Sequence, residues 1–96
     1  MKQYTTPKQT AKLIELGFEP ETKIKGVRTV HSKVKIDYVW NFTIGELIDM
    51  LGVHLSSIYY IGIEWFVNAE GLECRREELV DALYYTIVCL KEGGVI

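Results

Sequence analysis

The chain has 96 residues, of which 48% are hydrophobic and 25% are charged, and its net charge at neutral pH is −2. This length predicts a single domain over residues 1–96, and there is too much apolar material for a disordered chain. The small negative charge argues against a general polyanion binder. The longest apolar run is far shorter than the roughly 20 residues that a membrane span needs, so we expect no membrane segment.

A first helix is predicted to begin after Thr6, whose side chain suits an N-cap. Pro7 suits the first helical position, and Gln9 completes a capping box. The apolar residues that follow form one narrow stripe: Ala11, Leu13, Ile14 and Leu16. Gly17 supplies the left-handed C-cap that ends the helix, which lets the following phenylalanine fold back onto it.

Residues 33–40 alternate in the way of a half-buried strand. The apolar set is Val34, Ile36, Tyr38 and Trp40, and the alternating set is Lys33, Lys35, Asp37 and Val39. A period of two with one apolar face is the pattern of a strand on a core. A weaker pattern over residues 27–31 indicates a further edge strand.

A short second helix is predicted to begin at Thr43. Glu46 completes a second capping box, and Phe42 and Leu47 hold the two positions of a hydrophobic staple. The buried stripe is Leu47, Ile48 and Leu51. Gly52 ends the helix, which is so short that tertiary packing must hold it.

Residues 58–67 are β-branched and aromatic, which favours a strand over a helix. One set of side chains, Ile61, Ile63, Trp65 and Val67, alternates with Tyr60, Gly62, Glu64 and Phe66. We expect Trp40 and Trp65 to pack against the last helix. The opposite face then keeps Val39, Tyr60 and Phe66, and another element or subunit is expected to cover some of it.

The longest helix is predicted from about Arg76 to Glu92, followed by two glycines. Its apolar stripe is Leu79, Ala82, Leu83, Ile87 and Leu90, widened by Val80, Tyr84 and Val88. The order is helix, strand or hairpin, short helix, strand, long helix. This order predicts an α+β fold with three helices and a small antiparallel sheet of two or three strands.

No pattern of catalytic or metal-ligating residues stands out. The histidines and cysteines are His31, His54, Cys74 and Cys89, and none of their spacings is that of a metal site. We expect Cys89 to be a small core residue, Cys74 an ordinary loop residue and His54 a solvated turn residue. There is no glycine-rich phosphate loop and no nucleophile elbow. We therefore expect no enzymatic activity, no cofactor and no metal. Two cysteines without a signal-peptide pattern predict a reduced, cytoplasmic location.

The middle of the chain resembles the DNA-binding helix pair of MerR-type regulators. The residues that carry the resemblance are Thr43-Ile44-Gly45-Glu46-Leu47, Leu51-Gly52-Val53 and Ser57-Ile58-Tyr59-Tyr60. The chain departs from that family, which has an arginine where Tyr59 stands and opens with the helix pair. From Thr43 to Cys74 there is no lysine or arginine, although phosphate binding depends on such cations. The resemblance implies a degenerate helix-turn-helix at most.

A second resemblance covers more of the chain and concerns small proteins of gut-bacterial phages and mobile elements. The opening block is Tyr4-Thr5-Thr6-Pro7-Lys8-Gln9-Thr10, the central block Thr43-Ile44-Gly45-Glu46-Leu47-Ile48, and the closing block runs from Leu79 to Ile96. The resemblance implies a small accessory protein of a phage or integrated element, and it implies no active site.

Basic side chains gather in one stretch that contains no acid: Lys23, Lys25, Arg28, Lys33 and Lys35. Residues 36–96, in contrast, carry ten acidic residues against three basic ones. The simplest expectation is that this basic patch docks on the acidic part of the same fold. An arm for nucleic acid or an acidic partner, and a solvated face without a role, stay open as alternatives.

Adjacent aromatic residues lead to the main functional hypothesis. Neighbours on a strand point to opposite faces, and neighbours on a helix diverge, so one member of each pair must leave the core. The candidate interaction surface is Val39, Tyr59, Tyr60, Phe66, Tyr84 and Tyr85. We expect a non-enzymatic module that binds a protein partner or a second copy of itself as a homodimer. Nucleic-acid binding through residues 23–35 or the helix-turn-helix segment is the alternative.

Overall fold

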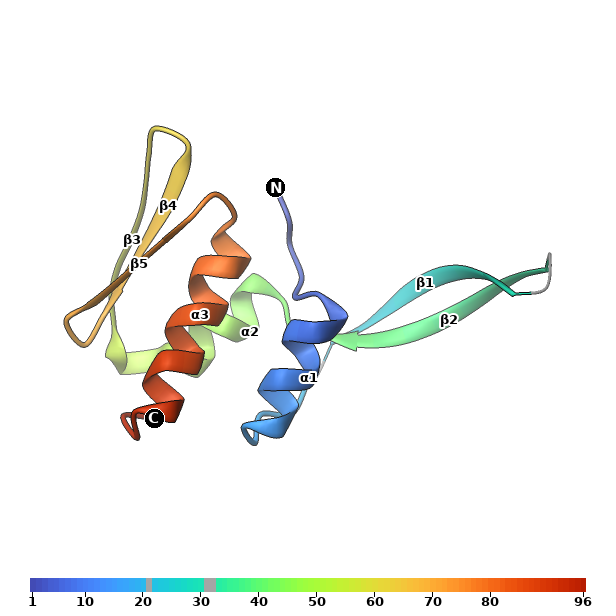
Figure 1. Cartoon of the computed structure of the whole chain (residues 1–96), viewed down its shortest axis with the longest axis horizontal. Coiled ribbons are helices and arrows are strands. Elements are labelled where there is room, and N and C mark those ends of the chain that lie inside the picture. The colour runs from blue at the N-terminus through green and yellow to red at the C-terminus, as the bar shows by residue number, and fades with distance from the viewer. Residues whose placement is uncertain (21, 31–32) are drawn as a thin grey trace.

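The structure is a computed structural model that describes the backbone of residues 1–20, 22–30 and 33–96, and the side chains outside residues 21–40. The elements in chain order are α1 (Pro7–Glu15), β1 (Thr22–Val30), β2 (Lys33–Asn41), α2 (Ile44–Leu51), the 3-10 turn η1 (Gly52–His54), β3 (Leu55–Ile61), β4 (Glu64–Ala69), β5 (Leu72–Arg76) and α3 (Leu79–Glu92). The fold is α+β, with three helices and a three-stranded antiparallel sheet, as predicted (Figure 1).

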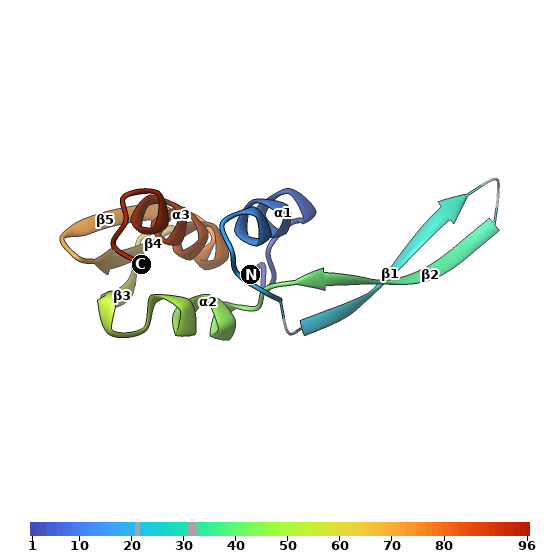
Figure 2. The ribbon, with the colours of Figure 1, turned by 90° about the horizontal axis from the view of Figure 1, so that it is seen from below.

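The strands form two separate antiparallel sheets. Among the residues that the structure describes, β1 and β2 pair only with each other, from Thr22 opposite Asn41 to Val30 opposite Lys33. This hairpin projects away from the helices in both views (Figures 1 and 2). The described backbone therefore leads residues 22–30 and 33–41 away from the three helices, in contrast to the docking on the acidic part of the fold that the charge distribution predicts.

The first two helices begin as their sequences predict. The Thr6 hydroxyl accepts the N–H of Gln9 at 3.2 Å, and the Gln9 side chain accepts the N–H of Thr6 at 2.9 Å. Thr43 and Glu46 make the same reciprocal pair, at 3.2 Å in both directions. Each box satisfies backbone donors that a helix start leaves open. Gly17 follows α1 with a φ of +102°, the left-handed backbone expected of its C-cap.

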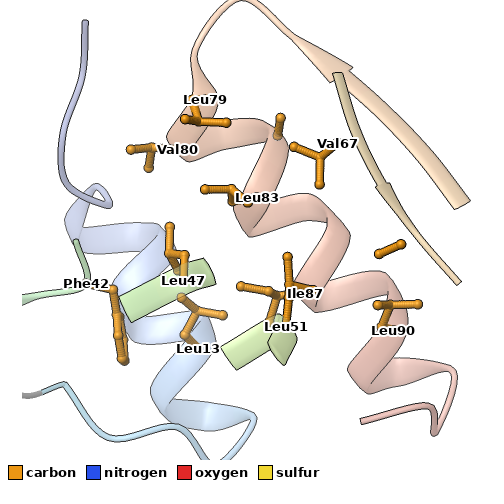
Figure 3. Close-up of a cluster of buried hydrophobic side chains, with 12 residues drawn as sticks. Leu13, Phe42, Leu47, Leu51, Val67, Leu79, Val80, Leu83, Ile87 and Leu90 are labelled. Atoms are coloured by element: carbon orange, nitrogen blue, oxygen red, sulfur yellow. The ribbon is translucent and has the colours of Figure 1, made fainter. Parts of the chain in front are cut away.

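The core forms on both sides of α3, which packs against α2 and against β4 and β5. Its fully buried side chains, most of them labelled in Figure 3, are Leu13, Phe42, Leu47, Leu51, Val67, Ala69, Val80, Ala82, Leu83 and Ile87. The predicted stripe of α3 is therefore confirmed. In α2, Leu47 and Leu51 are buried as predicted, whereas Ile48 is only partly buried. In α1 only part of the stripe is buried, because Leu13 faces the core while Ile14 is half exposed.

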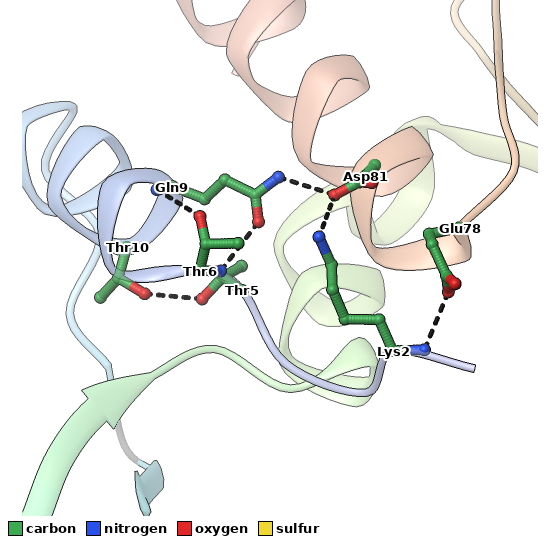
Figure 4. A network of polar contacts seen from close by, with 7 residues as sticks. All are labelled: Lys2, Thr5, Thr6, Gln9, Thr10, Glu78 and Asp81. Atoms are coloured by element: carbon green, nitrogen blue, oxygen red, sulfur yellow. Dashed lines mark hydrogen bonds and ion pairs between the residues drawn. The ribbon is translucent and has the colours of Figure 1, made fainter. Parts of the chain in front are cut away.

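A polar network ties the start of the chain to α3 (Figure 4). The Asp81 carboxylate accepts hydrogen bonds from the Lys2 Nζ at 2.5 Å and from the Gln9 Nε2 at 2.7 Å. The Glu78 carboxylate accepts a hydrogen bond from the Lys2 backbone N–H at 2.8 Å. Partial burial raises the pKa of Asp81. The hydrogen bonds from Lys2 and Gln9, with the charges of Lys2 and Arg76, outweigh that effect and leave this pKa below its ordinary value.

Residues 58–67 form two strands where the alternation predicts one. Gly62, with a φ of +67°, and Ile63 make a two-residue turn that places Ile61 opposite Glu64. A positive φ is accessible to glycine at little cost, which is why the chain can reverse there. Residues 55–61 are thus a strand, as the side-chain types indicate, and they provide no second helix for a helix-turn-helix pair.

The turn also changes which side chains share a face. Tyr60 lies opposite Trp65, and Tyr59 lies opposite Phe66. The prediction that Tyr60 and Trp65 lie on opposite faces was wrong, because odd-numbered residues of β3 share a face with even-numbered residues of β4. Trp65 packs against the core as predicted. The corresponding predictions for Trp40 and Val39 concern side chains outside the described ones.

β5 was not predicted, and it shortens the last helix. Residues 72–76 pair with β4, from Leu72 opposite Ala69 to Arg76 opposite Trp65. Because these residues extend along the sheet, α3 begins only at Leu79 and not at about Arg76. The added strand gives the sheet the order β3-β4-β5, with β4 in the middle.

Both cysteine predictions were wrong in detail. Cys74 is buried within β5 and is not a loop residue, and Cys89 is exposed on α3 and is not a core residue. The buried side of α3 is taken by Leu83, Thr86 and Leu90, which leaves Cys89 facing outward. His54 is half buried, and its Nδ1 lies 2.8 Å from the Glu70 Oε1, whereas His31 falls outside the described residues.

Candidate functional site

The register divides the three-stranded sheet into an inner face toward α3 and an outer face away from it. The inner face carries Ile58, Tyr60, Trp65, Val67, Ala69, Leu72 and Cys74. The outer face carries Ser57, Tyr59, Ile61, Glu64, Phe66, Asn68, Glu73 and Arg75. A sheet with one packed face and one open face normally has polar residues on the open one, so the aromatic residues there are the feature to explain.

An aromatic row crosses the outer face from one strand to the next. The ring of Tyr59 on β3 stacks on that of Phe66 on β4, with centroids 4.9 Å apart and planes 9° from parallel. The guanidinium of Arg75 on β5 lies 5.8 Å from the Phe66 centroid. The Tyr59 hydroxyl donates to the Glu73 carboxylate at 3.4 Å. All three strands thus contribute to one flat surface.

The tip of the β3–β4 hairpin exposes a second group of apolar side chains. Tyr60 is 53% exposed, Ile61 61% and Ile63 70%. The Tyr60 ring lies 5.0 Å from that of Trp65 across the hairpin. Sequence reasoning missed Ile61 and Ile63, because a single continuous strand assigns both to the buried face. Gly62 between them is the signal that could have revealed the turn.

The tyrosines of α3 lie on the inner side of the sheet. Tyr84 packs against the core, and its pKa is raised by desolvation. Tyr85 is 43% exposed, with its ring 5.1 Å from that of Tyr84 and 4.5 Å from the Arg76 guanidinium. Tyr59 and Phe66 stack on the outer face, whereas Tyr60 lies on the inner face beside Trp65. Arg76, the Cα partner of Trp65, lies over the Tyr85 ring on that same inner side. The described part of the predicted interaction surface is therefore divided between the two faces of the sheet.

The basic patch falls on the β1–β2 hairpin. Lys23, Lys25 and Arg28 belong to β1, and Lys33 and Lys35 belong to β2. Arg28 and Lys35 are Cα partners in the register. The backbone thus brings the five positions onto one projecting ribbon, and their side chains are outside the described set.

Two shallow depressions also mark the surface, and the lining of the second includes Glu64, Glu73 and Arg75 of the sheet. One, between the end of α1 and α2, is lined by Phe18, Glu19, Glu46, Asp49 and Met50. The other lies along β5 and α3, and its lining includes Arg76, Tyr85 and Cys89. Within the described ranges no three His, Cys, Asp or Glu side chains are grouped so as to hold a metal ion.

No family model, curated protein sequence or solved structure matches this chain. Among the residues that the structure describes, none of the helices has the length and apolar character needed to cross a bilayer.

Proposed function

We propose that this protein is a non-enzymatic protein-interaction module that binds through the end of its three-stranded sheet. We call this surface the sheet end and define it as Tyr59, Tyr60, Ile61, Ile63 and Phe66. The observation that carries the proposal is the hairpin tip, where three neighbouring large apolar side chains are each more than half exposed. Grouped exposed apolar side chains are typical of interaction sites, whereas single ones are ordinary surface.

The chemistry of the sheet end favours a protein as its partner. From Leu55 to Ile63 the chain contains no charged residue. Tyrosine and arginine are enriched at protein interfaces, and here Tyr59 and Tyr60 lie on one edge strand of the sheet and Arg75 on the other. A phosphate backbone would find few cations, since Arg76 is already held against Tyr85. Neutral, partly apolar protein surface is the better complement.

The resemblance of the opening, central and closing blocks to proteins of phages and mobile elements supports a narrower proposal. On that basis this module acts as an accessory protein of such an element, in the cytoplasm of the host cell. The sheet end would then bind a protein of the element or of the host, or a second copy of this chain.

Site-specific photo-crosslinking tests the interaction module. Benzoylphenylalanine replaces Ile63 in the full chain, and the matched control replaces Ile14, an isoleucine of α1 that is also half exposed. After irradiation in the producing cell, protein adducts are expected from position 63 and few from position 14. No protein adduct at position 63, or equal yields at both positions, would contradict the proposal.

A second candidate function, nucleic-acid binding, is favoured by the projecting hairpin. A two-stranded ribbon fits the major groove of DNA, and this one carries all five positions of the basic patch. Binding of a short duplex is measured from low to physiological salt. Phosphate contacts make affinity fall steeply with salt, and Lys33→Gln with Lys35→Gln reduces that slope while Lys91→Gln on α3 leaves it unchanged. Absence of binding in low salt would remove this candidate.

A further inference from the structure

We propose that the partner of the sheet end is a second copy of this chain, docked edge to edge through β3 so that one antiparallel sheet runs across both copies. The inference rests on the proposed function and names its partner. It also assigns the contact to the backbone edge of β3, in addition to the exposed side chains of the sheet end.

The register shows which backbone groups of β3 face outward. Ile61 and Glu64 flank a two-residue turn and therefore bond to each other. In an antiparallel pair, bonded and non-bonded positions alternate. Ser57 and Tyr59 thus bond to β4, while the N–H and C=O groups of Ile58 and Tyr60 point to the open side. No strand within the described residues pairs with that side.

The opposite edge of the sheet is closed by side chains. By the same alternation, the outward backbone groups of β5 belong to Glu73 and Arg75. The Arg76 guanidinium donates to the Arg75 carbonyl at 2.6 Å and lies over the Tyr85 ring. Three of the five residues of β5 are charged. Charged side chains and covered carbonyls are the usual protection of an edge strand, and β3 has neither.

The geometry of β3 fixes one register for self-pairing. A bulge between Leu55 and Ser57 at one end and the turn at Gly62 at the other limit the regular edge to residues 57–61. The centre of this segment is Tyr59. Two-fold pairing about Tyr59 places Ile58 opposite Tyr60 of the second copy, which makes about four backbone hydrogen bonds between the outward groups.

The side chains of this pairing are self-complementary. Tyr59 meets Tyr59 of the second copy at a non-bonded position, where cross-strand side chains approach most closely. The outer faces of the two copies become continuous, so the Tyr59–Phe66 stack extends into a row of four rings. No charges oppose each other across the two-fold axis, because the edge has none. A charged partner strand would find no counter-charge there.

The length of the β3 edge determines how tightly the two copies are expected to bind each other. Five regular residues on each side make a small interface, at or below the roughly 1,200 Å² that marks weak, transient complexes. We expect a dissociation constant on the order of 10–100 µM, so that the dimer forms and dissociates with concentration.

Two substitutions at one position separate backbone pairing from side-chain contact. Tyr60→Pro removes an N–H that points outward, which a strand edge tolerates. Tyr60→Ala removes the same ring but keeps the N–H. Sedimentation equilibrium from about 1 to 500 µM protein covers the expected dissociation constant. Tyr60→Pro is expected to raise this constant at least about tenfold more than Tyr60→Ala does. Equal dimerisation of the two variants would overturn the proposal.

Hydrogen exchange gives a second readout on the unaltered chain. The amides of Ile58 and Tyr60 are expected to become protected as concentration rises, and those of Glu73 and Arg75 are not. If Tyr60→Pro fails to fold, Tyr59→Lys replaces it, because it sets two like charges against each other across the axis. Tyr85→Lys, at a similarly exposed position on α3, is the matched control.

A strictly monomeric protein with concentration-independent exchange at Ile58 and Tyr60 would overturn the inference. If such a monomer still forms adducts with another protein from position 63, the interaction module survives and only the identity of its partner is wrong. If position 63 forms no protein adduct at all, the proposed function fails as well. The two failures are therefore distinguishable.

Discussion

The two edges of the three-stranded sheet, β3 and β5, have the same neighbour and opposite chemistry. Both pair with β4, yet the open side of β3 belongs to uncharged residues, and that of β5 belongs to Glu73 and Arg75. On β5 the Arg76 side chain takes a backbone carbonyl that a second strand would need. The side chains of each edge strand, and not the strand order, therefore decide which edge of this sheet is available for binding.

The largest expected effect comes from removing the support that both edges share. Leu83 of α3 is fully buried in the core and points toward Leu47 (Figure 3). Leu83→Ala is expected to lower the free energy of unfolding by about 2–5 kcal/mol, because it leaves a cavity in the core. Urea denaturation followed by circular dichroism measures the loss. The exposed control Tyr85→Ala should cost below about 1 kcal/mol, and similar losses in both variants would contradict this core assignment.

The outer face beside β3 can be tested by a double-mutant cycle. Tyr59→Ala, Phe66→Ala and the double variant are expected to show a coupling of about 0.5–1.5 kcal/mol, because the two rings stack in parallel. The control cycle uses Ser57 and Asn68, which share one exposed hydrogen bond of 3.1 Å on the same face. Its coupling should be smaller. A Tyr59–Phe66 coupling near zero would argue against an ordered aromatic row.

Removing the side chain that covers the edge of β5 should make this edge available for pairing, as the edge of β3 is. Arg76→Ala frees the Arg75 carbonyl and should cost no more than about 1 kcal/mol of stability, since the contacts it removes are exposed. In a variant that also carries Tyr60→Pro, which prevents pairing through β3, Arg76→Ala is expected to create self-association through β5. Hydrogen exchange at the Glu73 and Arg75 amides measures it. If these amides stay unprotected at high concentration, charge alone protects β5.

The smallest expected effect is a pH dependence that spares β3. The pKa of Asp81 is lowered in the folded chain by Lys2 and Gln9, so its contribution to stability is present above the ordinary value of about 4 and is lost as pH falls through the folded pKa. Thermal unfolding from pH 7 to pH 3 should show less acid destabilisation in Asp81→Asn than in the unaltered chain. Equal acid sensitivity of the two would contradict this role.

Dimerisation provides the matching contrast. From Leu55 to Ile63 no acidic, basic or histidine residue is present, so the β3 contact should be unchanged between about pH 5 and pH 8 in the folded protein. A dissociation constant that varies strongly in that range would indicate a charged interface elsewhere on the molecule.

Local rules predicted the starts of α1 and α2 correctly, because the groups involved lie within one turn of each other, whereas α3 begins at Leu79 and not at about Arg76. The Thr6–Gln9 and Thr43–Glu46 boxes need no information from the rest of the chain. Strand boundaries were harder to predict. The apolar residues on either side of Gly62 alternate as they would in one continuous strand. A two-residue turn at Gly62 exchanges the faces of odd-numbered and even-numbered residues, but it leaves this alternation uninterrupted.

The candidate site could be predicted only in part, for the same reason. Tyr59, Tyr60 and Phe66 were predicted as candidate surface residues, and the pairing places Tyr59 beside Phe66 on the outer face and Tyr60 on the inner face. Tyr84 and Tyr85 were predicted with them, and they belong to α3 on that inner side. Whether Cys89 is buried depends on how α3 rotates against the sheet, and an apolar stripe as wide as this one does not fix that rotation.

Propensity, capping and charge are properties of neighbouring residues, so the amino-acid sequence was sufficient to predict the α+β order, the capped starts of α1 and α2 and an uncharged middle segment. Only the tertiary structure decided that this segment forms an open edge. That outcome requires β5 to occupy the other side of β4 and Arg76 to cover its own strand. Strand pairing joins residues that are distant in the chain. A local sequence pattern therefore cannot predict which side of a strand is left unpaired.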